Sequence, residues 1–298
     1  MFRYFGYLLI TIMALVLAGG VGLVVFGVLA ERAATQGRVR LVAFDEVIPA
    51  GGSISQGLIV ASPVRFDAFL QDADYGRPVP DAWLIARLGD GSTTFLRTGS
   101  RGLAAGARRT ALDPGRHDFT VSLPDTHPRA DVVAHGCLWV LPPDCRVLWI
   151  DAEAIVPATA GAGAGGDLPS PVSTQATDAL QTLAVGRQPL YLVAAKAEDY
   201  ASVRRILRAS SVPPGPAIWL KPGGEASGLA AIRRAMSNVD GAIVTAQALA
   251  DEATRLKVPL WRVPHAGEPQ ADAAVVWREA VDILSLPQAL GRGAGEVK

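Results

Sequence analysis

Two carboxylates in the second half of the chain stand where an α/β enzyme would carry out chemistry. The run Arg146–Ile150, apolar after its first residue, has the composition of a buried strand; Asp151 follows it directly, and Glu153 stands two residues further on. Open α/β sheets bind ligands and perform chemistry beyond the carboxyl ends of their strands. A carboxylate nucleophile with a second carboxyl group close by is the arrangement that an aspartyl-phosphate enzyme needs. The sequence therefore predicts Asp151 as a nucleophile and Glu153 as a general acid/base.

The segments around these residues predict a sheet that would position them. From residue 145 to residue 298, strand-like runs alternate with amphipathic segments of helical length. The predicted strands cover residues 146–151, 190–194, 217–220, 241–245 and 259–263, and the predicted helices cover residues 173–184, 198–209, 227–237, 246–256 and 271–284. This alternation is typical of a parallel sheet covered by helices on both faces. We predict a three-layer, Rossmannoid α/β domain over residues 145–298.

The middle of the chain, residues 38–144, has the pattern of an all-β domain. Turn residues at Gly51-Gly52, Asp90-Gly91 and Pro114-Gly115 separate short apolar runs. Residues 117–123 alternate polar and apolar side chains, as a strand with one solvent-exposed face does. Several strands at this spacing predict a β-sandwich.

The turn phrases of this domain carry a resemblance. Gly76–Pro80, then Asp90-Gly91, then Leu112–His117 follow one another in an order that resembles prealbumin-like and bacterial immunoglobulin-like modules. The resemblance implies a spacer or a binding domain. A surface protein whose sandwich does the binding is therefore one hypothesis for the whole chain.

The N-terminal residues 1–37 predict a membrane anchor and a short linker. Residues 4–30 carry no charge, and about 20 apolar residues suffice to cross a hydrocarbon core. A cleaved signal peptide ending near Val28–Ala30 is the alternative, but apolar cores of signal peptides typically have only about 7–15 residues. We predict a retained transmembrane helix and a single-pass membrane protein, with the side of the later domains left open.

Composition excludes some classes of partner. The chain has 298 residues with 28 basic and 28 acidic side chains, so we do not expect nucleic acid as a partner. His117, His127 and His135 form no metal-ligand spacing with a neighbouring His, Cys or Glu. The two cysteines, Cys137 and Cys145, leave a disulfide open as an alternative to two small buried thiols.

Three phrases in the second half identify a second resemblance. Leu190–Ala194, Val203–Leu207 and the stretch Pro213–Pro216 that leads into the third strand resemble the haloacid dehalogenase-like (HAD-like) superfamily. The closest similarity is to the catalytic domain of actin-patch-type phosphatidate phosphatases, and it covers most of residues 146–263. The resemblance implies a phosphatase-like hydrolase fold with Asp151 as nucleophile and metal ligand, Mg²⁺ as cofactor, and Lys221 as the cation that stabilises the phosphorylated aspartate. Lys196 is a nearby substitute for Lys221.

The chain departs from the family pattern at several site positions. Glu153 stands in place of an aspartate, Val193–Ala195 replaces the expected hydroxyl residue, and Val244-Thr245 replaces acidic magnesium ligands. Asp240 precedes the fourth strand, while Asp251 and Glu252 fall within the next helix, so none of the three suits a metal site.

These departures favour one functional hypothesis over another. We expect a HAD-like domain that is catalytically degenerate and acts as a binding or scaffold module for a protein or a phosphorylated small molecule. The alternative is a Mg²⁺-dependent phosphohydrolase with an aspartyl-phosphate intermediate at Asp151. Because Pro157 and the run Gly161–Gly166 follow, we do not expect Asp151 to serve as a helix cap.

Overall fold

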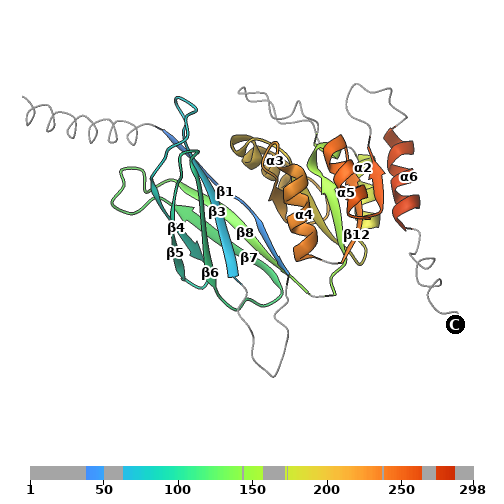
Figure 1. The fold of residues 1–298 in the computed structure, drawn as a ribbon, viewed down its shortest axis with the longest axis horizontal. Coiled ribbons are helices and arrows are strands. Elements are labelled where there is room, and N and C mark those ends of the chain that lie inside the picture. The colour runs from blue at the N-terminus through green and yellow to red at the C-terminus, as the bar shows by residue number, and fades with distance from the viewer. Residues whose placement is uncertain are drawn as a thin grey trace, which may run out of the picture.

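A β-rich part and an α/β part follow one another along the chain (Figure 1). The computed structural model describes residues 38–49, 63–142, 144–156, 172, 174–236, 238–263 and 273–285. The β-rich part ends with a strand at Leu141, and the α/β part begins with a strand at Val147. In Figure 1 the β-rich part lies on the left and the α/β part on the right.

The predicted fold class is wrong in its first element. Among the residues that the structure describes, no helix is long and apolar enough to cross a membrane. The longest of these helices have 13 residues each, whereas a membrane span needs about 20. The predicted anchor, residues 1–37, lies outside the described residues. The predictions of a transmembrane helix and of a single-pass location are therefore withdrawn.

The β-rich part, called the sandwich below, consists of two sheets packed face to face. One sheet has the order β1 (Val39–Ala43), β3 (Pro63–Asp72), β6 (Leu103–Arg109); the other has the order β2 (Glu46–Pro49), β8 (Val133–Leu141), β7 (Gly115–Ser122), β4 (Trp83–Leu88), β5 (Thr93–Arg97). Apolar side chains of both sheets form one core between them, among them Phe66, Leu84 and Phe119. Strand β3 shows why the sheet has two different faces: Phe66 and Ala68 point into this core, whereas Arg65 and Asp67 point out of it.

The α/β part has a five-stranded parallel sheet with helices on both faces. The strands lie in the order β11 (Ala217–Trp219), β10 (Gln188–Val193), β9 (Val147–Asp151), β12 (Val239–Val244), β13 (Leu260–Arg262). Helices α2 (Thr174–Leu183), α3 (Ala197–Ala209) and α6 (Ala273–Ser285) share one apolar core with the sheet, and α4 (Glu225–Ala235) and α5 (Gln247–Arg255) share the other. A short 3-10 helix, η1 (Ala152–Ala154), follows β9 directly.

The strand order reverses direction beside β9. Strands β9, β10 and β11 run outward to one edge, and the chain then returns to place β12 and β13 on the other side of β9. In such doubly wound sheets, ligands bind in the crevice beyond the carboxyl ends of the two strands at this switch point. Asp151 at the end of β9 and Thr245 after β12 lie at this point.

The chain between β1 and β2 joins the two parts. Phe44 stacks on Trp219 with ring centroids 4.5 Å apart, and it also meets the edge of Tyr200. The next residue, Asp45, forms a parallel β-bridge with Ile218 of β11. The sandwich thus covers the outer edge of β11 with its own backbone and packs an aromatic ring against the α/β core.

The turn before β11 depends on a residue without a side chain. A Cβ atom at Gly215 would lie 2.3 Å from the carbonyl oxygen of Pro189, on the neighbouring strand β10. Tyr191 donates a 2.6 Å hydrogen bond to the carbonyl of Pro213 in the same turn. The Pro-Pro-Gly-Pro stretch therefore runs in close contact with β10, which accounts for its glycine.

Candidate functional site: the switch point and the pocket between the two parts

Asp151 is sealed into the sheet rather than open to a substrate. Its side chain is 0% exposed, and one oxygen, Oδ1, accepts a 3.1 Å hydrogen bond from the backbone N–H of Glu153. The other oxygen, Oδ2, accepts from the N–H groups of Thr245 and Ala246 at 3.0 and 3.2 Å. The carboxylate therefore closes the switch point by joining the end of β9 to the turn that follows β12.

The expectation that Asp151 does not cap a helix is wrong. Helix η1 has only three residues, Ala152–Ala154, and it ends before Pro157, so the proline does not prevent it from forming. Asp151 has extended backbone dihedrals and bonds the N–H of Glu153, which is the geometry of an N-cap. The low-complexity stretch from Gly161 to Gly166 lies outside the described residues.

The other predicted acidic and basic site residues are exposed to solvent, whereas Asp151 is buried. Glu153 is exposed on η1, and Lys196 is exposed at the start of α3. Lys221 is exposed after β11, and because β10 lies between β9 and β11, the two strand ends are about 10 Å apart. Thr245 is 4% exposed, and its hydroxyl has no hydrogen-bond partner among the described residues.

The residues near the switch point do not fit a magnesium ion. Mg²⁺ requires a nearly octahedral set of oxygen ligands. The part of the chain that the structure describes contains no cluster of three or more His, Cys, Asp or Glu side chains suited to a metal. Both oxygens of Asp151 already accept backbone N–H groups, as described above.

The three other acidic residues considered from the sequence have different contacts. Asp240, at the beginning of β12, is paired with Arg146 and Arg187, whose guanidinium groups outweigh the effect of burial and lower the pKa of its carboxyl. Glu252 is paired with Arg255, and Asp251 accepts from the side chain of Gln247.

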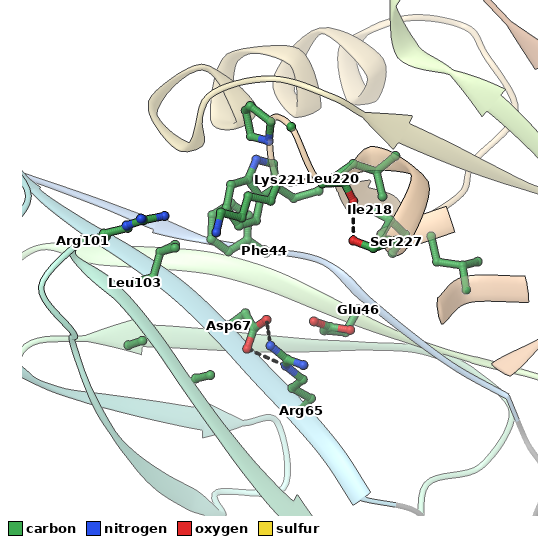
Figure 2. A pocket seen from close by; sticks show the side chains of 18 residues that line it. Phe44, Glu46, Arg65, Asp67, Arg101, Leu103, Ile218, Leu220, Lys221 and Ser227 are labelled. Carbon is green, nitrogen blue, oxygen red and sulfur yellow. Dashed lines mark hydrogen bonds and ion pairs between the residues drawn. The ribbon is translucent and has the colours of Figure 1, made fainter. Parts of the chain in front are cut away.

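A pocket of about 720 Å³ opens between the sandwich and the α/β part. Its sandwich wall includes Glu46 from β2 and Arg65 and Asp67 from β3 (Figure 2). The opposite wall is the loop from β11 to α4, with Lys221, and the first turn of α4, with Ser227. We call this the Glu46 pocket. Its volume lies within the range of about 300–1,000 Å³ that is usual for sites of small ligands.

The sequence places these side chains through strand alternation. Arg65 and Asp67 are two residues apart on β3, and because Phe66 between them enters the sandwich core, both face the α/β part. Phe44 and Glu46 are likewise two residues apart, and both line the Glu46 pocket. Asp45 between them faces the other way.

The carboxyl group of Glu46 has a raised pKa. Burial and the neighbouring carboxylates of Asp67 and Asp45 raise its pKa to about 8, and Arg65 offsets only part of this rise. Asp67, in contrast, is held by Arg65 through two contacts of 2.8 Å. Two carboxyl groups thus lie together, one ion-paired and one predominantly protonated at neutral pH.

Asp45 anchors the opposite side of the same segment. It is 3% exposed, and it accepts hydrogen bonds from Arg204 Nε at 3.0 Å and from the N–H of Cys137 at 2.9 Å. Tyr200 accepts from the N–H of Asp45 and donates to the carbonyl of Ala217. A second cavity of about 220 Å³, lined by Asp45, borders this network. Asp45 therefore fixes the position of Glu46.

Sequence reasoning missed the Glu46 pocket, although one signal was available. Asp45 and Glu46 interrupt an otherwise apolar stretch from Leu41 to Ile48. Two adjacent acids in a strand-like run are costly to bury, so they indicate a junction or a site. The sequence also leaves the cysteines open; in the structure Cys137 and Cys145 are free thiols.

No protein-family profile and no curated protein matches this chain. Among solved structures, the chain is similar to fibronectin(III)-like modules from Clostridium thermocellum, with 14% identity, a TM-score of 0.22, and coverage of 35% of this chain and 98% of that one. A carbohydrate acetylesterase from Xanthomonas citri shows 10% identity and a TM-score of 0.30, with 80% and 72% covered. Similarities at these TM-scores support no statement about fold or function.

Proposed function

We propose that this protein binds a small ligand in the Glu46 pocket and that its α/β part, which we predict to be HAD-like, does not transfer phosphoryl groups. The observation that carries the proposal is the state of Asp151. A nucleophilic carboxylate must reach the phosphorus atom of a substrate, whereas Asp151 is buried and bonds three backbone N–H groups through its two oxygens.

The contacts of the acidic and basic residues predicted for phosphoryl transfer support the same proposal. Phosphoryl transfer relies on cations that stabilise negative charge at the transferring group. Asp240, Asp251 and Glu252 make other contacts, and Lys221 follows a strand that is not adjacent to β9. A ligand pocket, in contrast, exists between the two parts and contains a carboxyl group with a raised pKa, a common property of functional sites.

The catalytic half of the proposal is tested by turnover of a generic aryl phosphate, with and without millimolar Mg²⁺. We expect no turnover by the full chain and no rise of its melting midpoint with Mg²⁺, because a cation that binds only the folded state would raise that midpoint. Turnover that is lost in Asp151→Asn and retained in Glu279→Gln, an exposed acid on α6, would overturn the proposal.

The binding half is tested by filling the pocket. Ser227 lines the pocket, and its neighbour Ala226 is exposed but is not part of the lining. In a screen of small-molecule mixtures, we expect compounds that raise the melting midpoint of the wild type and of Ala226→Trp but not of Ser227→Trp. Compounds that stabilise all three proteins equally would bind elsewhere and would contradict a ligand in this pocket.

A further inference from the structure

Glu46 is the acidic side chain of the pocket that lacks its own counter-charge. Arg65, the cation that acts on it, contacts both oxygens of Asp67. No donor among the described residues forms a hydrogen bond with the Glu46 carboxyl group. A partly buried carboxylate beside a second carboxylate gains from a cation that brings its own hydrogen-bond donors. A ligand ammonium group supplies a positive charge and three N–H donors.

Two cations lie toward the other end of the pocket. Arg101 comes from the turn between β5 and β6, and Lys221 comes from the loop between β11 and α4 (Figure 2). Neither forms an ion pair with another residue in the described part of the chain. Gly223 leaves the wall beside Lys221 open, since a Cβ atom there would meet nothing within 4 Å. This end of the pocket suits a carboxylate group.

We infer that the Glu46 pocket binds a small zwitterion, an amino acid or a short peptide, with its ammonium group at Glu46 and its carboxylate at Lys221 and Arg101. This inference rests on the proposed binding function and specifies its ligand. A ligand with a carboxylate alone would leave the Glu46 carboxyl group protonated and without a hydrogen-bond donor among the described residues, and a ligand with an ammonium group alone would leave Lys221 and Arg101 without an anion. The pocket volume of about 720 Å³ leaves room for side chains beyond the two charged groups.

The inference links binding to a proton. Glu46 faces Asp67 and Arg65 from β3, with Asp45 adjacent and with Arg101 and Lys221 further along the pocket. Because its pKa is about 8 in the free protein, Glu46 must release a proton before it can pair with an ammonium group. Affinity is expected to rise with pH up to about pH 8, by at most about tenfold per pH unit. The Glu46→Gln variant is expected to lose this dependence.

The test is calorimetric titration and thermal melting of the full chain with the standard free amino acids and with alanyl dipeptides. We expect at least one of them to bind, and its N-acetylated and its C-amidated forms to bind at least tenfold more weakly. Glu46→Gln and Lys221→Met should each weaken binding at least tenfold. The matched exposed residues are Glu279 and Lys257, neither of which lines the pocket, and Glu279→Gln and Lys257→Met should bind as the wild type does.

Three outcomes would overturn the inference: no zwitterion binds, a blocked form binds as well as the free form, or Glu46→Gln binds normally. None of these outcomes bears on phosphoryl transfer, because the aryl phosphate assay measures that activity separately. A pocket ligand of another charge pattern, excluded by Ser227→Trp, would retain the proposed function while refuting this ligand class. The melting midpoints of the unliganded variants show whether each is folded.

Discussion

Arg204 Nε lies 3.0 Å from Asp45 Oδ2, and this buried ion pair joins helix α3 to the junction of β1 and β2. Arg204 is 8% exposed and Asp45 is 3% exposed. Arg204 also donates to the carbonyl of His135, and the N–H of Ala217 lies 3.4 Å from the same carboxylate. The pair therefore connects the sandwich, α3 and β11 at one point.

Arg204→Ala should destabilise the protein strongly. The substitution removes the closer guanidinium partner of the buried Asp45 carboxylate and leaves only Arg208, whose Nη2 lies 3.8 Å from Oδ1. Breaking a buried pair costs about 3–5 kcal/mol, so we expect a loss toward the lower end of this range. Chemical denaturation measures the loss. Arg205→Ala on the same helix is the control; because Arg205 is exposed, its effect should stay within about 0.5 kcal/mol. Equal effects of the two substitutions would show that the pair contributes little.

Asp151→Ala should also reduce stability. It removes the acceptor of three backbone N–H groups, from Glu153, Thr245 and Ala246, and each buried donor left unsatisfied costs about 1–3 kcal/mol. We expect a loss of at least about 2 kcal/mol in the free energy of unfolding. Glu153→Ala, which changes an exposed neighbour, should have little effect. A stable Asp151→Ala protein would argue against a structural role for this carboxylate.

Glu46→Gln should change how stability depends on pH. The pKa of Glu46 is about 8 in the folded protein, whereas the ordinary value, 4.5, applies to the unfolded chain. Between these values the folded state holds more protons, so Glu46 lowers the stability as pH rises, by at most about 1.4 kcal/mol per pH unit. Urea denaturation over this range should show that the free energy of unfolding of Glu46→Gln increases relative to that of the wild type as the pH rises. Parallel curves for the two proteins would contradict a raised pKa.

Gly215→Ala should destabilise the turn before β11. The new methyl group would lie 2.3 Å from the backbone oxygen of Pro189, which cannot move without displacing β10. Overpacking of this kind typically costs about 1–3 kcal/mol. Gly89→Ala is the control, because a Cβ atom there would lie 3.7 Å from its nearest neighbour, an ordinary contact. Thermal melting of both variants makes the comparison, and a midpoint for Gly215→Ala equal to that of the control would refute the close approach.

The strands and helices of the α/β part were predictable because each leaves a local signal. The strand predicted at 146–151 is observed as Val147–Asp151, and the helix predicted at 198–209 is observed as Ala197–Ala209. Short apolar runs bounded by turn residues, and amphipathic segments of helical length, are properties of neighbouring residues. The start of β10 at Gln188, two residues earlier than predicted, reflects its parallel pairing with β9.

The role of Asp151 was not predictable in the same way. A carboxylate at a strand end has the same local sequence whether it attacks a substrate or accepts backbone N–H groups. The difference arises from Thr245 and Ala246, more than ninety positions further along the chain, which the sheet topology brings to Asp151. The crossing of the chain at Asp45 depends in the same way on Arg204 and Tyr200, so its function became visible only with the fold.

The parallel bridge between Asp45 and Ile218 limits how the two parts of the chain can be separated during evolution. A gene fragment that encoded only residues after Leu141 would produce a sheet with a bare margin at β11 and an uncovered Trp219, and such margins promote self-association. A module that replaced the sandwich by recombination would need residues that contact Ile218 and Trp219 as Asp45 and Phe44 do. The two halves are therefore expected to be transmitted together through evolution.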